Sequence, residues 1–175
     1  EGKILKKNEK ISLTTNSSLV NEDSVLEINY PSFTKDVKLG EKVLIDDGKI
    51  IFKVVSTNKK DLVELKVIQE GELKSRKGVN LPNTKISQPA LTEKDIKDAV
   101  FAIKNSFDWI ALSFVRSKRD VLELRELISK NCNHHIPIIS KIEKPEAIKK
   151  MDEIIKVSNG IMVARGDLGI EIPAE

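Results

Sequence analysis

The stretch from Ile136 to Ala164, IPIISKIEKPEAIKKMDEIIKVSNGIMVA, holds two short apolar runs separated by a helical pattern. The runs Ile136–Ile142 and Gly160–Ala164 have the length of buried strands. Pro145 suits the first turn of a helix, and apolar residues then recur at helical spacing, at Ile148, Met151 and Ile155. A strand, a helix and a strand within one short stretch predict a βαβ unit with parallel strands.

The same alternation continues upstream of this stretch. Thr92 and Asp95 have the spacing of a helix N-cap pair, and an apolar run at Trp109–Phe114 has the length of a strand. Two helical stripes accompany them, at Ile96, Val100 and Ile103 and at Val121, Leu124 and Ile128. Residues 90–175 thus form about three βα units. A (β/α)₈ barrel needs about 250 residues, so the pattern fits either a small open α/β sheet or an arc of a larger TIM barrel.

Residues 1–89 have a different period. Apolar and polar residues alternate, as at Val63, Leu65 and Val67, which is the pattern of half-buried strands. Asp46-Asp47-Gly48 lies between two apolar runs and predicts a hairpin turn. We expect an all-β domain here, an antiparallel small β-barrel or sandwich, followed by the α/β domain at residues 90–175.

Composition narrows the function classes. The chain has 30 lysines and arginines against 27 acidic residues and 4% aromatics, so a nucleic-acid binder is not indicated. No apolar run reaches the roughly 20 residues of a membrane span, and no signal-peptide core is present. The single cysteine, Cys132, points to a reducing compartment, so we expect a cytoplasmic protein.

Polar residues follow each expected strand of the α/β domain. Ser113 lies at the end of the first, Lys141 and Glu143 at the end of the second, and Ala164–Asp167 at the end of the third. Ligands of parallel α/β folds bind at these carboxyl ends. Two carboxylates with open positions suit Mg²⁺ or Mn²⁺, and a lysine beside them could stabilise a transferring phosphoryl group or an enolate.

Other interpretations of these residues stay open. Lys141 and Glu143 could form an exposed ion pair worth about 0.5 kcal/mol, and Gly166-Asp167 could be turn residues. Cys132, His134 and His135 have metal-binding side chains, but they lie in a helix-to-strand loop at the opposite end of the sheet, so a metal site there is disfavoured.

Two segments, Ile138–Ala147 (IISKIEKPEA) and Gly160–Glu175 (GIMVARGDLGIEIPAE), resemble the signature of pyruvate kinases. Shorter matches occur in the family's order at VLIDDG (Val43–Gly48), KGVNLP (Lys77–Pro82), LTEKDI (Leu91–Ile96) and ALSFVR (Ala111–Arg116). The resemblance implies that residues 1–89 are the lid domain inserted into a (β/α)₈ barrel, and that residues 90–175 carry barrel strands four to six. The missing initiator Met and the end inside the motif at Ile172–Glu175 suggest a fragment.

The resemblance also implies residue roles. Lys141 matches the catalytic lysine, Glu143 and Asp167 match the metal ligands, and Lys77 matches a nucleotide-contacting lysine of the lid. Asp47 matches a lid aspartate that approaches the metal. The substrate-binding positions are Lys141, Ser113, Ala164, Arg165, Gly166 and Asp167.

The activity implied is glycolytic phosphoryl transfer from phosphoenolpyruvate to ADP, giving pyruvate and ATP. It requires Mg²⁺ or Mn²⁺. It also requires K⁺, and the ligands of K⁺ lie outside this chain. The parent enzyme is expected to be a homotetramer without nucleic-acid or membrane partners, and this fragment alone is expected to be inactive. Two alternatives remain: a metal-dependent phosphoenolpyruvate/pyruvate-type aldolase or lyase, and a non-catalytic fragment that binds metal or phosphate.

Overall fold

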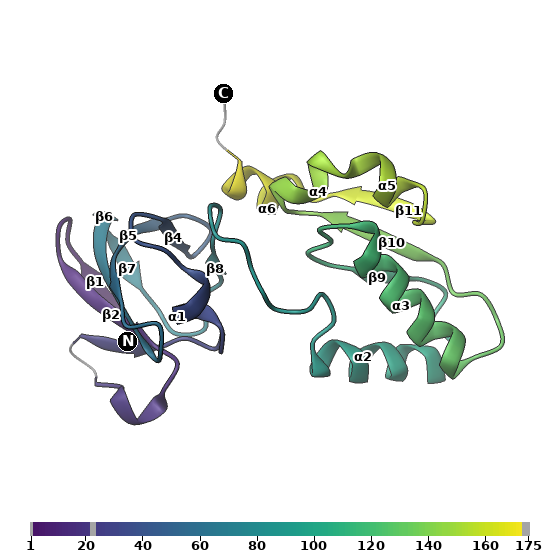
Figure 1. Cartoon of the computed structure of the whole chain (residues 1–175), viewed down its shortest axis with the longest axis horizontal. Coiled ribbons are helices and arrows are strands. Elements are labelled where there is room, and N and C mark those ends of the chain that lie inside the picture. The colour runs from purple at the N-terminus through teal and green to yellow at the C-terminus, as the bar shows by residue number, and fades with distance from the viewer. Residues whose placement is uncertain (1, 22–23, 173–175) are drawn as a thin grey trace. The chain divides into compact units, whose positions relative to one another are not determined.

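The computed structural model describes residues 2–21 and 24–172 of the chain (Figure 1). The last three residues of the signature segment, from Pro173 on, lie outside the described residues. The chain divides into two compact units, the first ending at Ser87 and the second beginning at Gln88. Each is described separately below, as the β-unit and the α/β-unit.

The β-unit is built from a curled sheet of six strands, in the order β3-β2-β6-β5-β4-β8, and a separate antiparallel pair, β1 and β7. Two short helical turns, η1 and α1, connect the strands. In chain order the elements are β1 (Lys3–Leu5), β2 (Lys10–Thr14), η1 (Ser17–Leu19), β3 (Val25–Glu27), α1 (Phe33–Asp36), β4 (Lys42–Ile45), β5 (Ile50–Thr57), β6 (Leu62–Gln69), β7 (Gly71–Leu73) and β8 (Val79–Asn80).

The alternating pattern places the core of this unit. Val63, Leu65 and Val67 of β6 are fully buried, while the residues between them face outward. The predicted hairpin is confirmed, since β4 and β5 pair with Ile45 opposite Ile50 around the turn at Asp46–Lys49. The expected all-antiparallel arrangement is wrong at one pair: β2 and β3 run parallel. Alternation gives the buried face of a strand but not its direction.

The α/β-unit contains a three-stranded parallel sheet in the order β11-β10-β9, with helices between the strands (Figure 1). This agrees with the predicted βα units. Its elements are α2 (Glu93–Lys104), β9 (Ile110–Leu112), α3 (Lys118–Asn131), β10 (Ile138–Ile142), α4 (Pro145–Lys149), α5 (Met151–Ile155), β11 (Gly160–Val163) and α6 (Arg165–Glu171).

One predicted helix is wrong in detail. The helix after Pro145 is two short helices that meet at Lys150, whose φ of −120° and ψ of 20° leave the helical region. The break shifts the buried face, so Ala147 and Ile154 are buried while the expected stripe residues Ile148 and Ile155 are exposed. A single helical period across the whole segment could not register this break.

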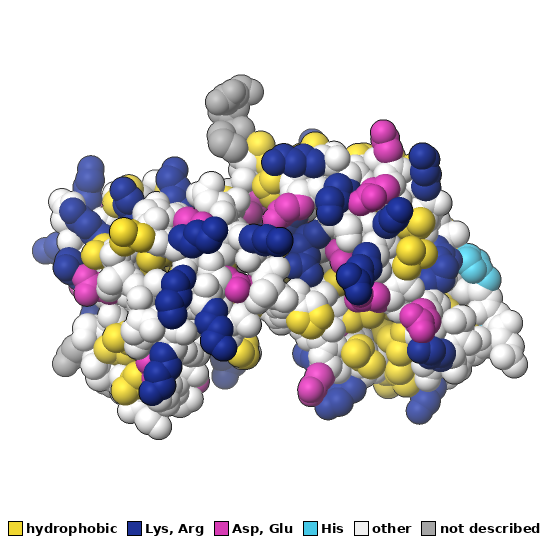
Figure 2. All heavy atoms as spheres, in the orientation of Figure 1, with side chains coloured by type: hydrophobic (Ala, Val, Ile, Leu, Met, Phe, Trp, Pro, Cys, Tyr) yellow, Lys and Arg dark blue, Asp and Glu magenta, His cyan; other side chains and the backbone are white. Residues whose placement is uncertain are grey.

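Both edges of the parallel sheet are open within residues 88–172, because β9 and β11 each pair only with β10. Large hydrophobic side chains are exposed in this unit, and Figure 2 shows such side chains at its surface over α2 and α3. Met162 and Val163 of the edge strand β11 are 45% and 53% exposed. Unpaired strand edges and apolar surface both favour association. None of the described helices has the length and apolar character required to span a membrane.

Tyr30 bonds to Asp36, the last residue of α1, which in turn holds Ser87 at the end of the β-unit. Its hydroxyl donates a hydrogen bond to Asp36 Oδ2, and the same oxygen accepts the backbone N–H of Ser87 at 2.7 Å. Burial of the phenol, its hydrogen bond to Asp36 and the charge of that carboxylate raise the pKa of Tyr30 to about 12.

Because Tyr30 is the single tyrosine of the chain, its ionisation can be followed directly by ultraviolet absorbance. We expect a titration midpoint near pH 12, compared with 10 for an unperturbed tyrosine. Because the pKa of Tyr30 is higher in the folded than in the unfolded chain, its protonated hydroxyl stabilises the fold. This stabilisation is complete below pH 10 and is lost as the pH rises through about 12. Asp36→Asn should return the midpoint towards 10; a wild-type midpoint near 10 would contradict the Tyr30–Asp36 bond.

The open sheet edges predict self-association of this chain. In analytical ultracentrifugation at micromolar concentration, we expect species larger than the 19.6 kDa monomer. Val163→Lys places a charge on the exposed edge of β11 and should shift the distribution towards monomer. Lys149→Met, which leaves both edges unchanged, should not. A wild-type chain that sediments as a single monomeric species at all concentrations would show that the edges are not adhesive.

Candidate functional site

Three predicted site residues meet at the carboxyl ends of β9 and β10. Lys141 lies in β10, and its Nζ is 2.5 Å from Oε1 of Glu143 and 3.2 Å from Oγ of Ser113. Ser113 directly follows β9, whose last residue Leu112 is paired with Ser140. The parallel register therefore brings Ser113 beside Lys141, as the strand-end argument predicted.

Glu143 is buried, with only 2% of its surface exposed. Besides the ammonium of Lys141, its carboxylate accepts the backbone N–H of Phe114 through Oε2 at 2.7 Å. The interpretation of Lys141 and Glu143 as an exposed ion pair is therefore wrong. Removing one partner of a buried pair leaves an uncompensated charge, which costs about 3–5 kcal/mol.

Phe114 adopts an unusual backbone conformation, with a φ of 54°. Left-handed φ values are uncommon for bulky residues and cost of order 1–3 kcal/mol, so they persist only where the surroundings enforce them. Here the conformation accompanies the hydrogen bond from the Phe114 N–H to Glu143. No sequence pattern signalled this residue, because only glycine or asparagine marks such positions reliably.

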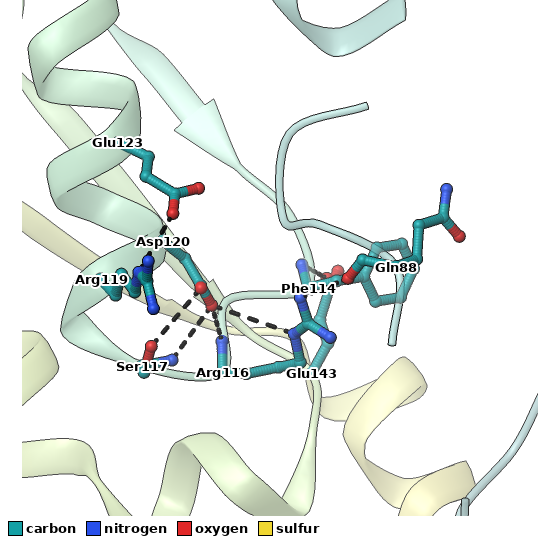
Figure 3. A network of polar contacts seen from close by, with 8 residues as sticks. All are labelled: Gln88, Phe114, Arg116, Ser117, Arg119, Asp120, Glu123 and Glu143. Carbon is teal, nitrogen blue, oxygen red and sulfur yellow. Dashed lines mark hydrogen bonds and ion pairs between the residues drawn. The ribbon is translucent and has the colours of Figure 1, made fainter. Parts of the chain in front are cut away.

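The loop after Phe114 is held by a second set of bonds, shown in Figure 3. The buried carboxylate of Asp120 accepts the backbone N–H groups of Arg116 at 2.7 Å and Ser117 at 3.1 Å. Arg116 in turn donates from Nη2 to the carbonyl oxygen of Gln88 at 2.8 Å. Asp120 was not predicted as a site residue, although the Ser117-x-x-Asp120 spacing resembles a helix-capping pattern.

The second carboxylate, Asp167, lies in the first turn of α6. Ala164 precedes this helix and donates its N–H to the carbonyl of Ile142 at 3.2 Å, so α6 begins beside the end of β10 that carries Glu143. Arg165 and Gly166 are exposed. A Cβ at Gly166 would meet no atom within 4 Å, so packing within the described residues does not require glycine there.

The donor set suits a divalent oxygen-seeking ion. Among residues 2–21 and 24–172, no group of three or more His, Cys, Asp or Glu could hold a metal. Glu143 follows β10 directly, and Asp167 lies in the first turn of α6, which begins beside it. Mg²⁺ and Mn²⁺ fit such a site, because they take one or two carboxylates and complete their shell with water and substrate oxygens.

The disfavoured cysteine and histidine residues make local bonds instead. Cys132 Sγ contacts the carbonyl of His134 at 3.2 Å, and the His135 ring lies 3.3 Å from the side-chain amide of Asn159.

In the β-unit, the predicted nucleotide lysine Lys77 pairs with Asp46. Lys77 Nζ is 3.0 Å from Oδ1 of Asp46, and Lys49 Nζ is 3.1 Å from its Oδ2. Hydrogen bonds from these two lysines lower the pKa of Asp46. Asp47, the predicted lid aspartate, is exposed in the turn with a φ of 56°. Sequence reasoning missed Asp46, since the two adjacent aspartates look equivalent in a turn sequence.

Comparisons with known proteins give the family of the chain. Residues 1–175 match the family described as pyruvate kinase, barrel domain. The chain is 44% identical to the pyruvate kinase of Geobacillus stearothermophilus over 172 residues, which is 98% of this chain and 29% of the relative. It is 41% identical to the Staphylococcus haemolyticus pyruvate kinase, covering 100% of this chain and 30% of the relative.

The pyruvate kinase of Clostridium perfringens is 41% identical over 98% of this chain and 36% of its own length. The chain thus spans about a third of these relatives. Because the family match extends over every residue, from the β-unit to the helix that carries Asp167, this chain belongs to the pyruvate kinase family.

Proposed function

We propose that this chain is part of an enzyme that transfers the phosphoryl group of phosphoenolpyruvate to ADP. The observation that carries the proposal is the contact of Lys141 with both Glu143 and Ser113 in a member of the pyruvate kinase family. In this proposal residues 1–89 are the lid domain, and β9, β10 and β11 are strands four to six of the barrel.

A divalent ion held by Glu143 and Asp167 would supply positive charge next to the transferring group. Phe114 fixes Oε2 of Glu143 through its N–H and Lys141 lies on Oε1, so the carboxylate that would hold the ion is already oriented by these two groups. Lys141 is then available to the phosphoryl oxygens, while Ser113 limits its movement. Ala164, Arg165, Gly166 and Asp167 would line the position of the substrate carboxylate.

The chemical step breaks the phosphorus–oxygen bond of phosphoenolpyruvate and forms one to the terminal phosphate of ADP. Lys141 stabilises the negative charge of the phosphoryl group during transfer. The enolate that remains takes up a proton at carbon to give pyruvate. In the β-unit, Lys77 would bind nucleotide phosphate by exchanging Asp46 for it, and Asp47 would approach the metal.

The cofactors proposed are Mg²⁺ or Mn²⁺ together with K⁺, whose ligands would come from parts of the relatives that this chain does not cover. We further propose a cytoplasmic homotetramer as the complete enzyme. The isolated chain is expected to be inactive, because it covers about a third of its relatives. The aldolase or lyase alternative loses support from the same relatives, each of which is named a pyruvate kinase.

The test is pyruvate formation from phosphoenolpyruvate and ADP with Mg²⁺ and K⁺, measured on the full-length protein beside this chain. We expect turnover by the former and none by the latter. A folded full-length protein that forms no pyruvate would overturn the proposed activity. Turnover by the isolated chain would show that the uncovered segments are dispensable.

Lys141→Met in the full-length protein should lower kcat by at least about 10², since single electrostatic donors contribute that much. Binding of Mn²⁺ should persist, because the substitution removes the cation that competes for Glu143. Lys149→Met, an exposed position at the end of α4, serves as the control and should retain wild-type kcat. Circular dichroism verifies folding of both variants. Near-normal turnover by a folded Lys141→Met variant would remove Lys141 from the mechanism.

A further inference from the structure

A buried ion pair lies next to the proposed metal site and has no part in the chemistry described above. Lys144 directly follows Glu143, and its Nζ is 2.5 Å from Oε1 of Glu171. Lys144 and Glu171 are 6% and 5% exposed. Among the ion pairs of residues 2–21 and 24–172, this is the one in which both side chains are less than a tenth exposed.

Stability alone does not explain such a pair. Burying a lysine and a glutamate costs several kcal/mol of desolvation for each ion, and apolar residues of similar volume are often equally stable or better. A buried pair does, however, restrict geometry, because each charge tolerates few positions other than contact with its partner. The pair therefore fixes the end of α6 relative to the turn between β10 and α4.

The position of Glu171 within α6 gives this restriction a consequence. Asp167 lies four residues before Glu171, so both occupy the same face of the helix, about 6 Å apart along its axis at about 1.5 Å per residue. The bond to Lys144 restricts the rotation of α6 about its axis and its distance from the turn after β10. The face that carries Asp167 is then held towards the segment that carries Glu143 and Lys144.

The other end of the ion pair reaches the groups that hold Glu143. Lys144 Nζ lies 5.9 Å from the centre of the Phe114 ring, within the range of cation–π attraction. The N–H of Phe114 is the donor to Glu143 Oε2. Contacts thus run without a gap from Glu143 through Phe114 and Lys144 to Glu171.

We propose that Lys144 and Glu171 are positioning residues that set the separation of the two metal-binding carboxylates, Glu143 and Asp167. This inference rests on the proposed function, because the ion in question is the divalent metal of that site. Lys144 and Glu171 do not touch the ion. They act on it by docking α6, and metal affinity depends on the resulting geometry.

The experiment uses the full-length protein with Mn²⁺ as the probe, and free Mn²⁺ is counted by electron paramagnetic resonance. The main variant is the double substitution Lys144→Met with Glu171→Leu, which removes both charges and leaves neither unpaired. Its thermal melting should stay close to wild type. Its Kd for Mn²⁺ should rise about tenfold or more, as for other groups that orient metal ligands.

Turnover gives a readout that a merely structural role would not move. In the double variant the Mn²⁺ concentration for half-maximal activity should rise by the same factor of about ten, while kcat at saturating Mn²⁺ stays close to wild type. The single variant Lys144→Arg keeps the positive charge beside Glu171 and should retain wild-type Mn²⁺ affinity. Lys130→Met breaks the exposed pair with Glu126 on α3 and serves as the control that should change neither quantity.

Hydrogen exchange measures the docking itself. The amides of Leu168 and Ile172, which bond to Ala164 and Leu168 within α6, should exchange faster in the double variant, while those of α3 stay unchanged.

A double variant with wild-type Mn²⁺ affinity and unchanged α6 exchange would overturn the inference and leave the proposed function standing. A wild-type protein that fails to bind Mn²⁺ would overturn the proposed function, and the metal-positioning role with it. A Lys144→Arg variant whose Mn²⁺ affinity falls as far as that of the double variant would also count against the ion pair.

Discussion

The buried carboxylate of Glu143 is the constraint on which the α/β-unit depends. An anion removed from water must be met by charge and hydrogen bonds, and here Lys141 and the N–H of Phe114 supply them. The strained left-handed backbone of Phe114 follows from that requirement, because it accompanies the N–H that the carboxylate needs. Asp120 accepts the backbone N–H groups of Arg116 and Ser117 and so holds the loop that follows Phe114. The buried carboxylate and the local backbone conformation thus occur together, and the bonds at the start of α3 support both.

The same buried charge extends its influence through Lys144. Three ionised side chains are buried close together: Glu143, Lys144 and Glu171. Their desolvation costs free energy that apolar side chains of similar volume would not, so stability alone does not explain them. Their alternation of sign instead builds a short electrostatic chain with fixed geometry. Its ends are the terminus of β10, where Ile142 packs into the core, and the seven-residue helix α6, whose buried residue is Glu171 itself. In α6, charge pairing therefore takes the place of apolar burial.

The sequence predicted much of this arrangement, and its failures have physical causes. Period-two and helical patterns located the core strands and the parallel βα units, because burial of one face is what such patterns record. The stripe at Ile148 and Ile155 failed because a backbone break at Lys150 carries no pattern signal. Residue roles for Lys141, Glu143 and Asp167 came from family resemblance, whereas Phe114, Asp120 and Asp46 were missed. Phe114 and Asp120 act through backbone N–H groups, which leave no mark in the sequence. Asp46 and Asp47 are adjacent and chemically identical, and only the fold shows that Asp46 pairs with Lys77.

The two lysines assigned to ligand binding differ in what holds them. Lys77 pairs with Asp46 at a partly exposed site, where solvent screens the attraction, so under the proposed function a phosphate can replace the aspartate at little cost. Lys141 pairs with a carboxylate that is almost wholly buried, and it cannot leave unless another cation takes its place. A divalent ion at Glu143 meets that condition, and phosphate alone does not. Under the proposed function, the charge on Glu143 therefore favours an order in which the metal binds before Lys141 turns to the phosphoryl group.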